Sequence, residues 1–193
     1  TGDGAGGVPE LVGDPTEGAV MVLAAKAGEH GETLRAEFPR VGEMPFDSTR
    51  KMMAVVTDDP SRGLDRLLMV KGATDVVLDE CTRLVTHDGL KPLDDRRIAE
   101  VTDLMTGYGA EGLRVLAVAG KELPSDWQGD PEDELADLVL YGLVGILDPP
   151  RKEAGIAIAE CRDAGIAVKM ITGDHATTAA AIHRFIDRSL VRG

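Results

Sequence analysis

Two consecutive prolines, Pro149 and Pro150, separate two parts of this 193-residue sequence that differ in patterning. Before them, short apolar runs alternate with turn signals, whereas after them an amphipathic helix leads into a continuous apolar run. Proline restricts the backbone angle φ and disfavours helix in the residue before it, so the pair stiffens the chain. The sequence therefore predicts a hinge at 148–150 between two domains, 1–147 and 148–193.

The first part predicts an α+β domain in which an antiparallel sheet is flanked by helices. Apolar runs on both sides of the turn DDPSRG indicate a hairpin within 51–72. Pro15 and Asp94-Asp95 are helix starts, and Gly28 is a helix stop. The predicted helices are 15–27, 31–37, 74–83 and 94–106, and the predicted strands are 40–46, 51–57, 66–72, 84–86, 113–123 and 138–147.

The second part predicts the beginning of a parallel α/β sheet, because a helix at 153–165, a buried strand at 166–172 and a further helix follow one another. Ligands of such folds bind at the carboxyl edge of the sheet, where Thr172, Gly173 and Asp174 would lie. The N–H groups of the following helix would favour a phosphate there. A simple helix cap by Asp174 is the alternative, and the two roles are compatible.

The formal net charge of −13 excludes some partners. Lysine and arginine do not cluster as a nucleic-acid site requires, so no nucleic-acid partner is expected. No apolar run approaches the ~18 residues that span a bilayer, so the chain itself is expected to be soluble. Cys81 and Cys161 have no metal-ligand spacing, and no metal site is expected. The acidic stretch 124–137 is interpreted as a solvated insertion without a function.

The segment 44–53, MPFDSTRKMM, combines an aromatic residue with cations, which are ingredients of a nucleotide site. A P-loop is excluded because G-x-x-x-x-G-K-[ST] does not occur, so a base needs an aromatic or apolar slot and its phosphates need lysine or arginine. Phe46 stands in polar company at a strand end, and Arg50 and Lys51 follow it. The alternative for Phe46 is a plain core position.

Lys71-Gly72-Ala73 and Arg114 are the second set of candidates. An apolar strand leads to Lys71, and Gly72 would let the backbone approach a ligand closely. Arg114 lies near the start of a later apolar strand. Either cation alone is explained as well by a solvated charge at a strand end, so their joint spacing carries the inference.

Six ordered blocks of this sequence resemble the P-type ATPases, specifically the branch that includes calcium and sodium/potassium pumps. Together they span about 14–184 and are far more specific than any one block. They are GDPTEGA (13–19), MPFDSTRKMM (44–53), VKGATD (70–75), GLRVLAVA (112–119), GILDPPR (145–151) and VKMITGDHATTA (168–179). The resemblance implies a cytoplasmic nucleotide-binding (N) domain, followed by a partial phosphorylation (P) domain of haloacid-dehalogenase-like α/β fold.

The resemblance also implies roles for individual residues. Phe46 would stack on adenine, and Lys71 would line the adenine pocket and reach toward the phosphates. Glu17 would contact the adenine side, Arg114 the phosphate chain, and Lys51 would be a further cation at the pocket. The residues matched on the nucleotide side are Glu17, Phe46, Arg50, Lys51, Lys71, Gly72, Ala73 and Arg114, and those on the phosphoryl and Mg²⁺ side are Asp148, Thr172, Gly173 and Asp174.

Two departures from the family pattern limit what the chain would do alone. Ser48 stands where calcium pumps of the animal muscle type carry an arginine, and Arg50 is the candidate to take over that phosphate contact. The D-K-T-G-T motif with the aspartate nucleophile is absent, as is the later G-D-G-x-N-D motif. The chain is therefore expected to bind ATP with its Mg²⁺ but not to turn it over.

The expected setting is the cytoplasmic face of a membrane pump that hydrolyses ATP to transport a cation. The remaining phosphorylation, actuator and transmembrane domains of that pump would be its partners, and the TGDH and DPPR variants resemble a calcium-like subgroup. One alternative is a phosphatase of the haloacid dehalogenase type, which needs an apolar strand ending in Asp-x-Asp or Asp-x-Thr that the sequence lacks. The other is a nucleotide-sensing module without catalysis.

Overall fold

The chain divides into two compact units, Thr1–Pro39 and Arg40–Gly193. The predicted hinge at 148–150 lies outside the described residues, so the domain boundary there stays a prediction. The computed structural model describes residues 15–59, 65–147, 152–169, 171, 180–182 and 184.

The first unit contains two helices, α1 (Pro15–Lys26) and α2 (Gly31–Glu37). Proline in the first turn loses no hydrogen bond, because the N–H groups there have no partner within the helix. Gly28 follows α1 with a φ of 89°, a left-handed conformation that favours glycine and ends helices. Each helix begins and ends within one residue of the bounds predicted from the sequence.

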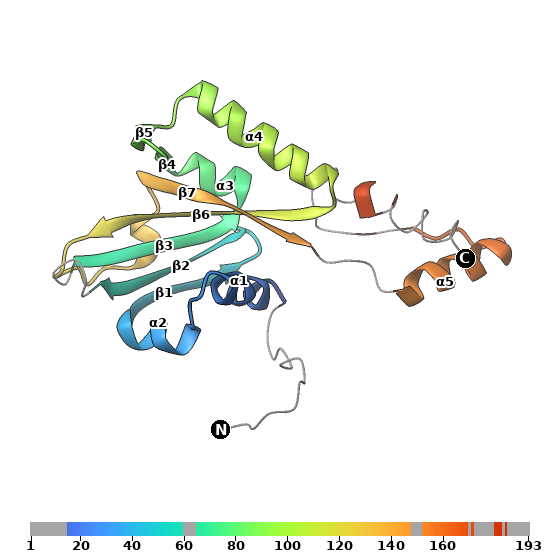
Figure 1. Cartoon of the computed structure of the whole chain (residues 1–193), viewed down its shortest axis with the longest axis horizontal. Helices are drawn as coiled ribbons and strands as arrows, with labels where there is room; N and C mark the ends of the chain where they lie inside the picture. The colour runs from blue at the N-terminus through green and yellow to red at the C-terminus, as the bar shows by residue number, and fades with distance from the viewer. Residues whose placement is uncertain are drawn as a thin grey trace. The chain divides into compact units, whose positions relative to one another are not determined.

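The described part of the second unit is built on a seven-stranded sheet with the order β1-β2-β3-β6-β7-β4-β5 (Figure 1). The sequence does not predict β5, whose four residues include a glycine and a proline. The strands are β1 (Arg40–Asp47), β2 (Met52–Asp59), β3 (Asp65–Ala73), β4 (Cys81–Thr86), β5 (Gly89–Pro92), β6 (Leu113–Leu123) and β7 (Leu138–Leu147).

The sheet is mixed, which corrects the antiparallel sheet predicted from the sequence. β4 runs parallel to β7, whereas the other neighbouring strands are antiparallel. Hairpin signals report on strands that follow one another in the chain. β4 and β7 are separated by β5, a helix and β6, so no turn signal could reveal their pairing.

Two helices, α3 (Thr74–Asp79) and α4 (Asp95–Ala110), lie on one side of the sheet (Figure 1). α3 is shorter than the predicted helix 74–83, because Cys81 already begins β4 and pairs with Leu138 of β7. α4 is longer than predicted and begins at the N-cap Asp94, whose carboxylate accepts a hydrogen bond from the Arg97 N–H at 3.0 Å.

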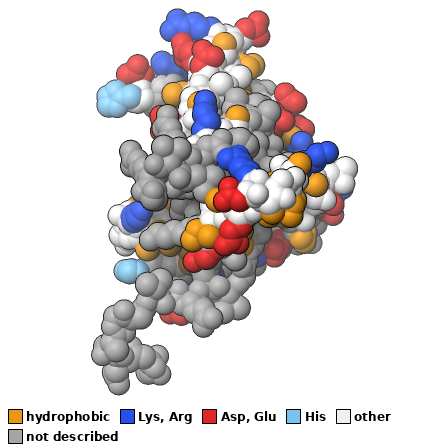
Figure 2. All heavy atoms as spheres, turned by 90° about the vertical axis from the view of Figure 1, so that its right-hand side faces the viewer, with side chains coloured by type: hydrophobic (Ala, Val, Ile, Leu, Met, Phe, Trp, Pro, Cys, Tyr) orange, Lys and Arg blue, Asp and Glu red, His pale blue; other side chains and the backbone are white. Residues whose placement is uncertain are grey.

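Charges of both signs are distributed over the described surface. Figure 2 shows Asp and Glu side chains interspersed with Lys and Arg on the face that it draws. The excess of acidic residues is therefore spread out there, and no large basic patch lies among the described side chains of that face.

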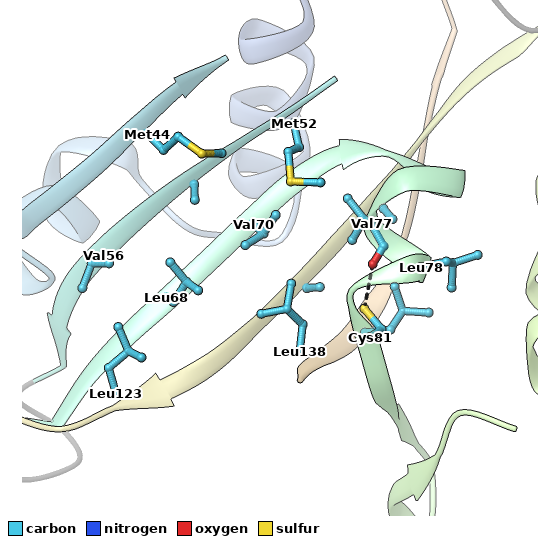
Figure 3. Close-up of a cluster of buried hydrophobic side chains, with 14 of the residues drawn as sticks. Met44, Met52, Val56, Leu68, Val70, Val77, Leu78, Cys81, Leu123 and Leu138 are labelled. Atoms are coloured by element: carbon cyan, nitrogen blue, oxygen red, sulfur yellow. Dashed lines mark hydrogen bonds between the residues drawn. The ribbon is translucent and has the colours of Figure 1, made fainter. Parts of the chain in front are cut away.

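The core lies between the sheet and the helices on that side, and it is aliphatic, as the low aromatic content of 3% requires. Alternate residues of β2 and β3 point into it, because side chains of a strand alternate between the two faces. Leu68 and Val56 are fully buried, and Val77 of α3 belongs to the same cluster and lies near Cys81 (Figure 3). Met44, Met52, Val70, Ala117 and Leu138 belong to the same cluster.

Most residues of the stretch 124–137 are exposed, as predicted, but the stretch is also anchored to the sheet. Trp127 packs against the core cluster, and its indole N–H donates to Glu134 at 3.0 Å. Glu134 also pairs with Lys121 of β6 at 2.8 Å, and this cation and the Trp127 N–H lower the pKa of the Glu134 carboxyl. The buried Pro131 begins a short 3-10 helix, η2 (Pro131–Glu134). We name 124–137 the acidic strap.

The segment after β7 forms a helix, α5 (Lys152–Asp163), as predicted. The buried strand predicted at 166–172 is wrong for the described residues, since 166–169 and 171 form no strand and Ile171 is 96% exposed. An apolar run becomes a strand only when neighbouring strands satisfy its backbone, and no described residue pairs with this one. Within the described ranges, no helix is long and apolar enough to cross a membrane.

Candidate functional site

Four strand ends meet at one end of the sheet, and they carry most of the residues predicted for a nucleotide site. β1 ends at Asp47, β2 begins at Met52, β3 ends at Ala73 and β6 begins at Leu113. The register is continuous across them, because Asp47 pairs with Met52 and Met52 pairs with Gly72. Residues far apart in the sequence thus share one edge of the fold.

Lys71 lies in a row of residues that crosses four neighbouring strands. It is flanked by Met53 of β2 and Val118 of β6, and Val118 in turn pairs with Gly142 of β7. This row belongs to the face of the sheet opposite the core, since Gly72 next to Lys71 faces the core. No described atom lies within 4 Å of the place where a Cβ on Gly142 would be. The face is therefore apolar around Lys71 and open above Gly142.

Arg114 shares that face with Lys71. It lies four residues before Val118 on β6, and residues an even number apart on a strand point to the same side. It is exposed and pairs in register with Ile146 of β7. The tertiary structure therefore brings the two predicted phosphate cations to one face at one end of the sheet.

Phe46 is 63% exposed, so the alternative that it is a plain core residue is wrong. It is the next-to-last residue of β1, where the register with β2 shifts between Met44 and Asp47. An exposed phenylalanine leaves a large apolar ring in water, which is unfavourable without an occupant. Its exposure at the end of β1 suits a ring that stacks on a planar ligand.

The turn that follows Phe46, residues 47–51, is tightly organised. The Asp47 carboxylate accepts hydrogen bonds from the N–H groups of Arg50 and Thr49, each at 2.9 Å. These two bonds, that from Arg50 first, hold the pKa of the Asp47 carboxyl below its ordinary value. Lys51 has a φ of 54°, which is unusual for a residue with a side chain, and its N–H donates to the Asp47 carbonyl at 2.7 Å.

Gly72 is required by the turn. A Cβ at this position would lie 2.6 Å from the Lys51 carbonyl oxygen and 2.6 Å from the Met52 Cβ. The Ala73 N–H donates to the same Lys51 oxygen at 2.9 Å. The close backbone approach that the sequence indicates at Gly72 is thus an approach to the 47–51 turn.

Arg50 is placed differently from the other predicted cations. Its guanidinium forms an ion pair with Glu132 of the acidic strap. Both residues line a cavity of about 450 Å³, together with Met52, whose side chain belongs to the core face. Arg50 therefore lies on the core side of the sheet end, and Lys71 lies on the opposite side. The other residues that line this cavity are Val76, Glu80, Asp133, Leu135 and Ala136.

The remaining predicted residues belong to the other unit or lie outside the described residues. Glu17 lies in the first turn of α1, within the unit Thr1–Pro39. Asp148, Thr172, Gly173 and Asp174 lie outside the described residues. Among the described residues, no group of three or more His, Cys, Asp or Glu side chains could hold a metal ion.

The sequence reasoning missed Glu132 and Gly142. A glycine within a continuous apolar run was a signal for Gly142, because a strand interior rarely omits a side chain without a reason. Glu132 carried no signal of its own, since it is one of several acids in the acidic strap. Its pairing with Arg50 depends on two segments that are distant in the chain.

A family model decides the identity of this fold. The model that describes the P-type ATPase cytoplasmic domain N matches residues 2–153. The chain belongs to the P-type ATPases. The match covers the whole seven-stranded sheet and ends just inside α5.

Curated relatives agree with this assignment. The chain is 46% identical over 177 residues to a probable cation-transporting ATPase F of Mycobacterium tuberculosis, and that alignment covers 90% of the chain. It is 40% identical over 172 residues, or 89% of the chain, to a calcium-transporting ATPase of Bacillus subtilis. It is 42% identical over 173 residues, again 89%, to the cation-transporting ATPase pma1 of Synechocystis. The alignments cover only 18–19% of these relatives.

Three of the six sequence blocks form the sheet end of this N domain. The block 44–53 supplies the end of β1 and its turn, the block 70–75 supplies the end of β3, and the block 112–119 supplies the start of β6. The blocks are far apart in the chain, yet the register of the sheet makes them neighbours.

Proposed function

We propose that this N domain binds ATP on the face of the sheet opposite the core, at the end where Phe46, Lys71 and Arg114 gather. The observation that carries the proposal is the row Met53, Lys71, Val118 and Gly142, an apolar and partly open floor with a single cation in it. A base needs an apolar slot, and a phosphate chain needs a cation at the mouth of that slot.

Each residue then has a role that its place supports. Phe46 stacks on adenine, with the ring exposure that stacking requires. Lys71 lies under the nucleotide and reaches toward its phosphates, while Lys51 and Arg114 extend the positive charge along them. Gly72 and Ala73 hold the turn in place. Mg²⁺ would arrive with the nucleotide, bound to its phosphates.

The proposed role within a longer protein is presentation of the γ-phosphate. Adenine is held by apolar contact, so the phosphates project away from the sheet toward an aspartate that this sequence lacks. Asp148, Thr172, Gly173 and Asp174 would belong to the phosphorylation side. Positioning and charge neutralisation dominate such a transfer, and Mg²⁺ supplies neutralisation when it is bound. We propose a cation pump, with calcium as the candidate ion, as the whole protein.

Nucleotide titration followed by backbone amide shifts tests the site. Phe46→Ala should weaken ATP and adenosine alike by about tenfold or more, because stacking of a base on an aromatic ring is worth about 1–3 kcal/mol. Lys71→Ala should weaken ATP much more than adenosine, which carries no phosphate. Leu90→Ala and Lys91→Ala on β5, at the far edge of the sheet, are the matched controls.

Two results would contradict the proposal. One is that the amides near residues 46, 71 and 114 stay unmoved at millimolar ATP. The other is that the β5 controls lose as much affinity as the site variants. The phosphatase alternative rested on a strand at 166–172, which the described residues do not form.

A further inference from the structure

The 47–51 turn carries Lys51 and follows directly on Phe46, so its position decides where two nucleotide-binding side chains lie. The bonds to Asp47 and the contact of Gly72 with Lys51 are made within the neighbouring strands β1 to β3. The ion pair of Arg50 with Glu132 is different, because it ties the turn to a distant segment, the acidic strap.

Glu132 is held firmly on the acidic strap. Its N–H donates to the Asp130 carboxylate at 2.9 Å, which caps η2. Trp127 packs against Gly42 of β1, with ring atoms 3.3 Å from the place of a Cβ there. Lys121 and Arg66 fix the acidic strap from the sheet, through the Lys121–Glu134 pair at 2.8 Å and a hydrogen bond from the Arg66 guanidinium to the Trp127 carbonyl. The carboxylate that meets Arg50 is therefore preorganised.

The residues around Arg50 favour a guanidinium that stays in the cavity beside Glu132. Three acidic residues, Glu80, Glu132 and Asp133, line the same cavity. If Arg50 left to meet a phosphate, three negative groups would stay close together without that cation, and like charges repel. Arg50 also lies on the core side of the sheet end, away from the Lys71 row.

We propose that Glu132 is a positioning residue for nucleotide binding, which holds Arg50 and, through it, the turn that carries Lys51 and follows Phe46. This inference rests on the proposed function of the opposite face. Arg50 is then an anchor of the site and makes no contact with phosphate. The pair is about half-exposed, with side-chain exposures of 45% and 47%, so its loss should change overall stability little.

Four variants of the full chain test the pair, namely Arg50→Gln, Glu132→Gln, the double variant and Asp133→Asn. Each single change at the pair should weaken ATP and adenosine by the same factor, about threefold, as for loss of an exposed ion pair. The double variant should bind no more weakly than either single one, because both changes remove one interaction. Asp133→Asn removes a charge from the same cavity but keeps the pair, and should bind like the parent.

Hydrogen exchange of the Thr49 and Arg50 amides provides a readout that needs no nucleotide. Their bonds to Asp47 should open more often in Glu132→Gln, and exchange should speed up by about threefold there but not in Asp133→Asn. Unchanged exchange at these two amides would overturn the inference, whatever the nucleotide data show.

The nucleotide data separate the remaining outcomes. If Glu132→Gln tightens ATP binding, or if Arg50→Gln weakens ATP and spares adenosine, Arg50 is a phosphate ligand and the inference fails. If the parent chain binds neither ATP nor adenosine, the proposed function fails, and the positioning role for nucleotide fails with it. Faster exchange of these amides in Glu132→Gln would then still show that the Arg50–Glu132 ion pair stabilises the 47–51 turn.

Discussion

The carbonyl oxygen of Lys51 lies 2.6 Å from the point that a Cβ on Gly72 would occupy, so no larger residue fits there without a shift of the backbone. The Ala73 N–H donates to this same oxygen at 2.9 Å. The end of β3 and the turn after β1 are thereby joined into one unit. Lys71, one residue earlier, is placed relative to Phe46 and Lys51 by this contact.

Gly72→Ala should destabilise the fold by about 1–3 kcal/mol, because the clash is with backbone and with the Cβ of Met52, neither of which can rotate away. Urea unfolding followed by the fluorescence of Trp127 measures the free energy of unfolding. Gly142→Ala is the matched control, since its Cβ would enter open space. Equal stability of Gly72→Ala and the parent would refute the packing argument.

Larger residues in place of Gly142 should leave the free energy of unfolding unchanged but should weaken nucleotide binding. Gly142→Val would fill the space beside Val118 and Lys71 without meeting a described atom at its Cβ. We expect unchanged unfolding in urea, and ATP and adenosine affinities that fall as the side chain grows from alanine to valine to leucine. If these affinities do not change along the series, the nucleotide does not bind over the row that contains Gly142.

The Asp47 carboxylate should make stability at the turn depend on pH. Its two N–H donors lower its pKa in the folded state relative to the unfolded state, so its contribution is present above the unfolded pKa. The contribution is lost as the pH falls through the lowered, folded pKa. The stability difference between the parent and Asp47→Asn should therefore be present at neutral pH and shrink in acid. A difference that grows in acid would contradict this sign.

The two cysteines should differ in reactivity. Burial, and secondarily the charge of Glu80, raises the pKa of the Cys81 thiol to about 11, and its Sγ lies 3.1 Å from the Val77 carbonyl oxygen, to which it donates. Because the thiolate is the reactive form, Cys81 should resist iodoacetamide at pH 8 until the protein unfolds. Cys161 is only partly buried and should be modified first, as peptide mass spectrometry would show. Equal rates in the folded protein would contradict the packing of Cys81.

Local patterns predicted much of the fold. The apolar runs at 113–123 and 138–147 predicted β6 and β7 with their observed bounds, because such a run depends only on neighbouring residues. The run at 166–172 has a similar pattern, yet its described residues form no strand. A pattern states which residues would be buried, but a strand also needs partners for its backbone.

The sequence predicted only part of the candidate site, because it shows residue types but not long-range neighbours. Phe46, Lys71 and Arg114 are residue types suited to a nucleotide, and the sequence singled them out. The side chains of Arg50 and Lys51 follow one another in the chain, but the sequence could not say that Arg50 meets Glu132 on the core side. That pairing depends on the anchoring of the acidic strap, and its acidic composition predicts only that it is solvated.

The sequence by itself determined most of the strands and helices, the hairpin turn between β2 and β3 and the kinds of side chain available for a ligand, since each follows from short-range geometry and composition. Only the tertiary structure decided which of them meet. The register across β2, β3, β6 and β7 placed Lys71 in an apolar row beside Gly142, and the acidic strap held Arg50 on the other side. Such long-range neighbours depend on how all the strands and the acidic strap pack at once, which no local window of sequence contains.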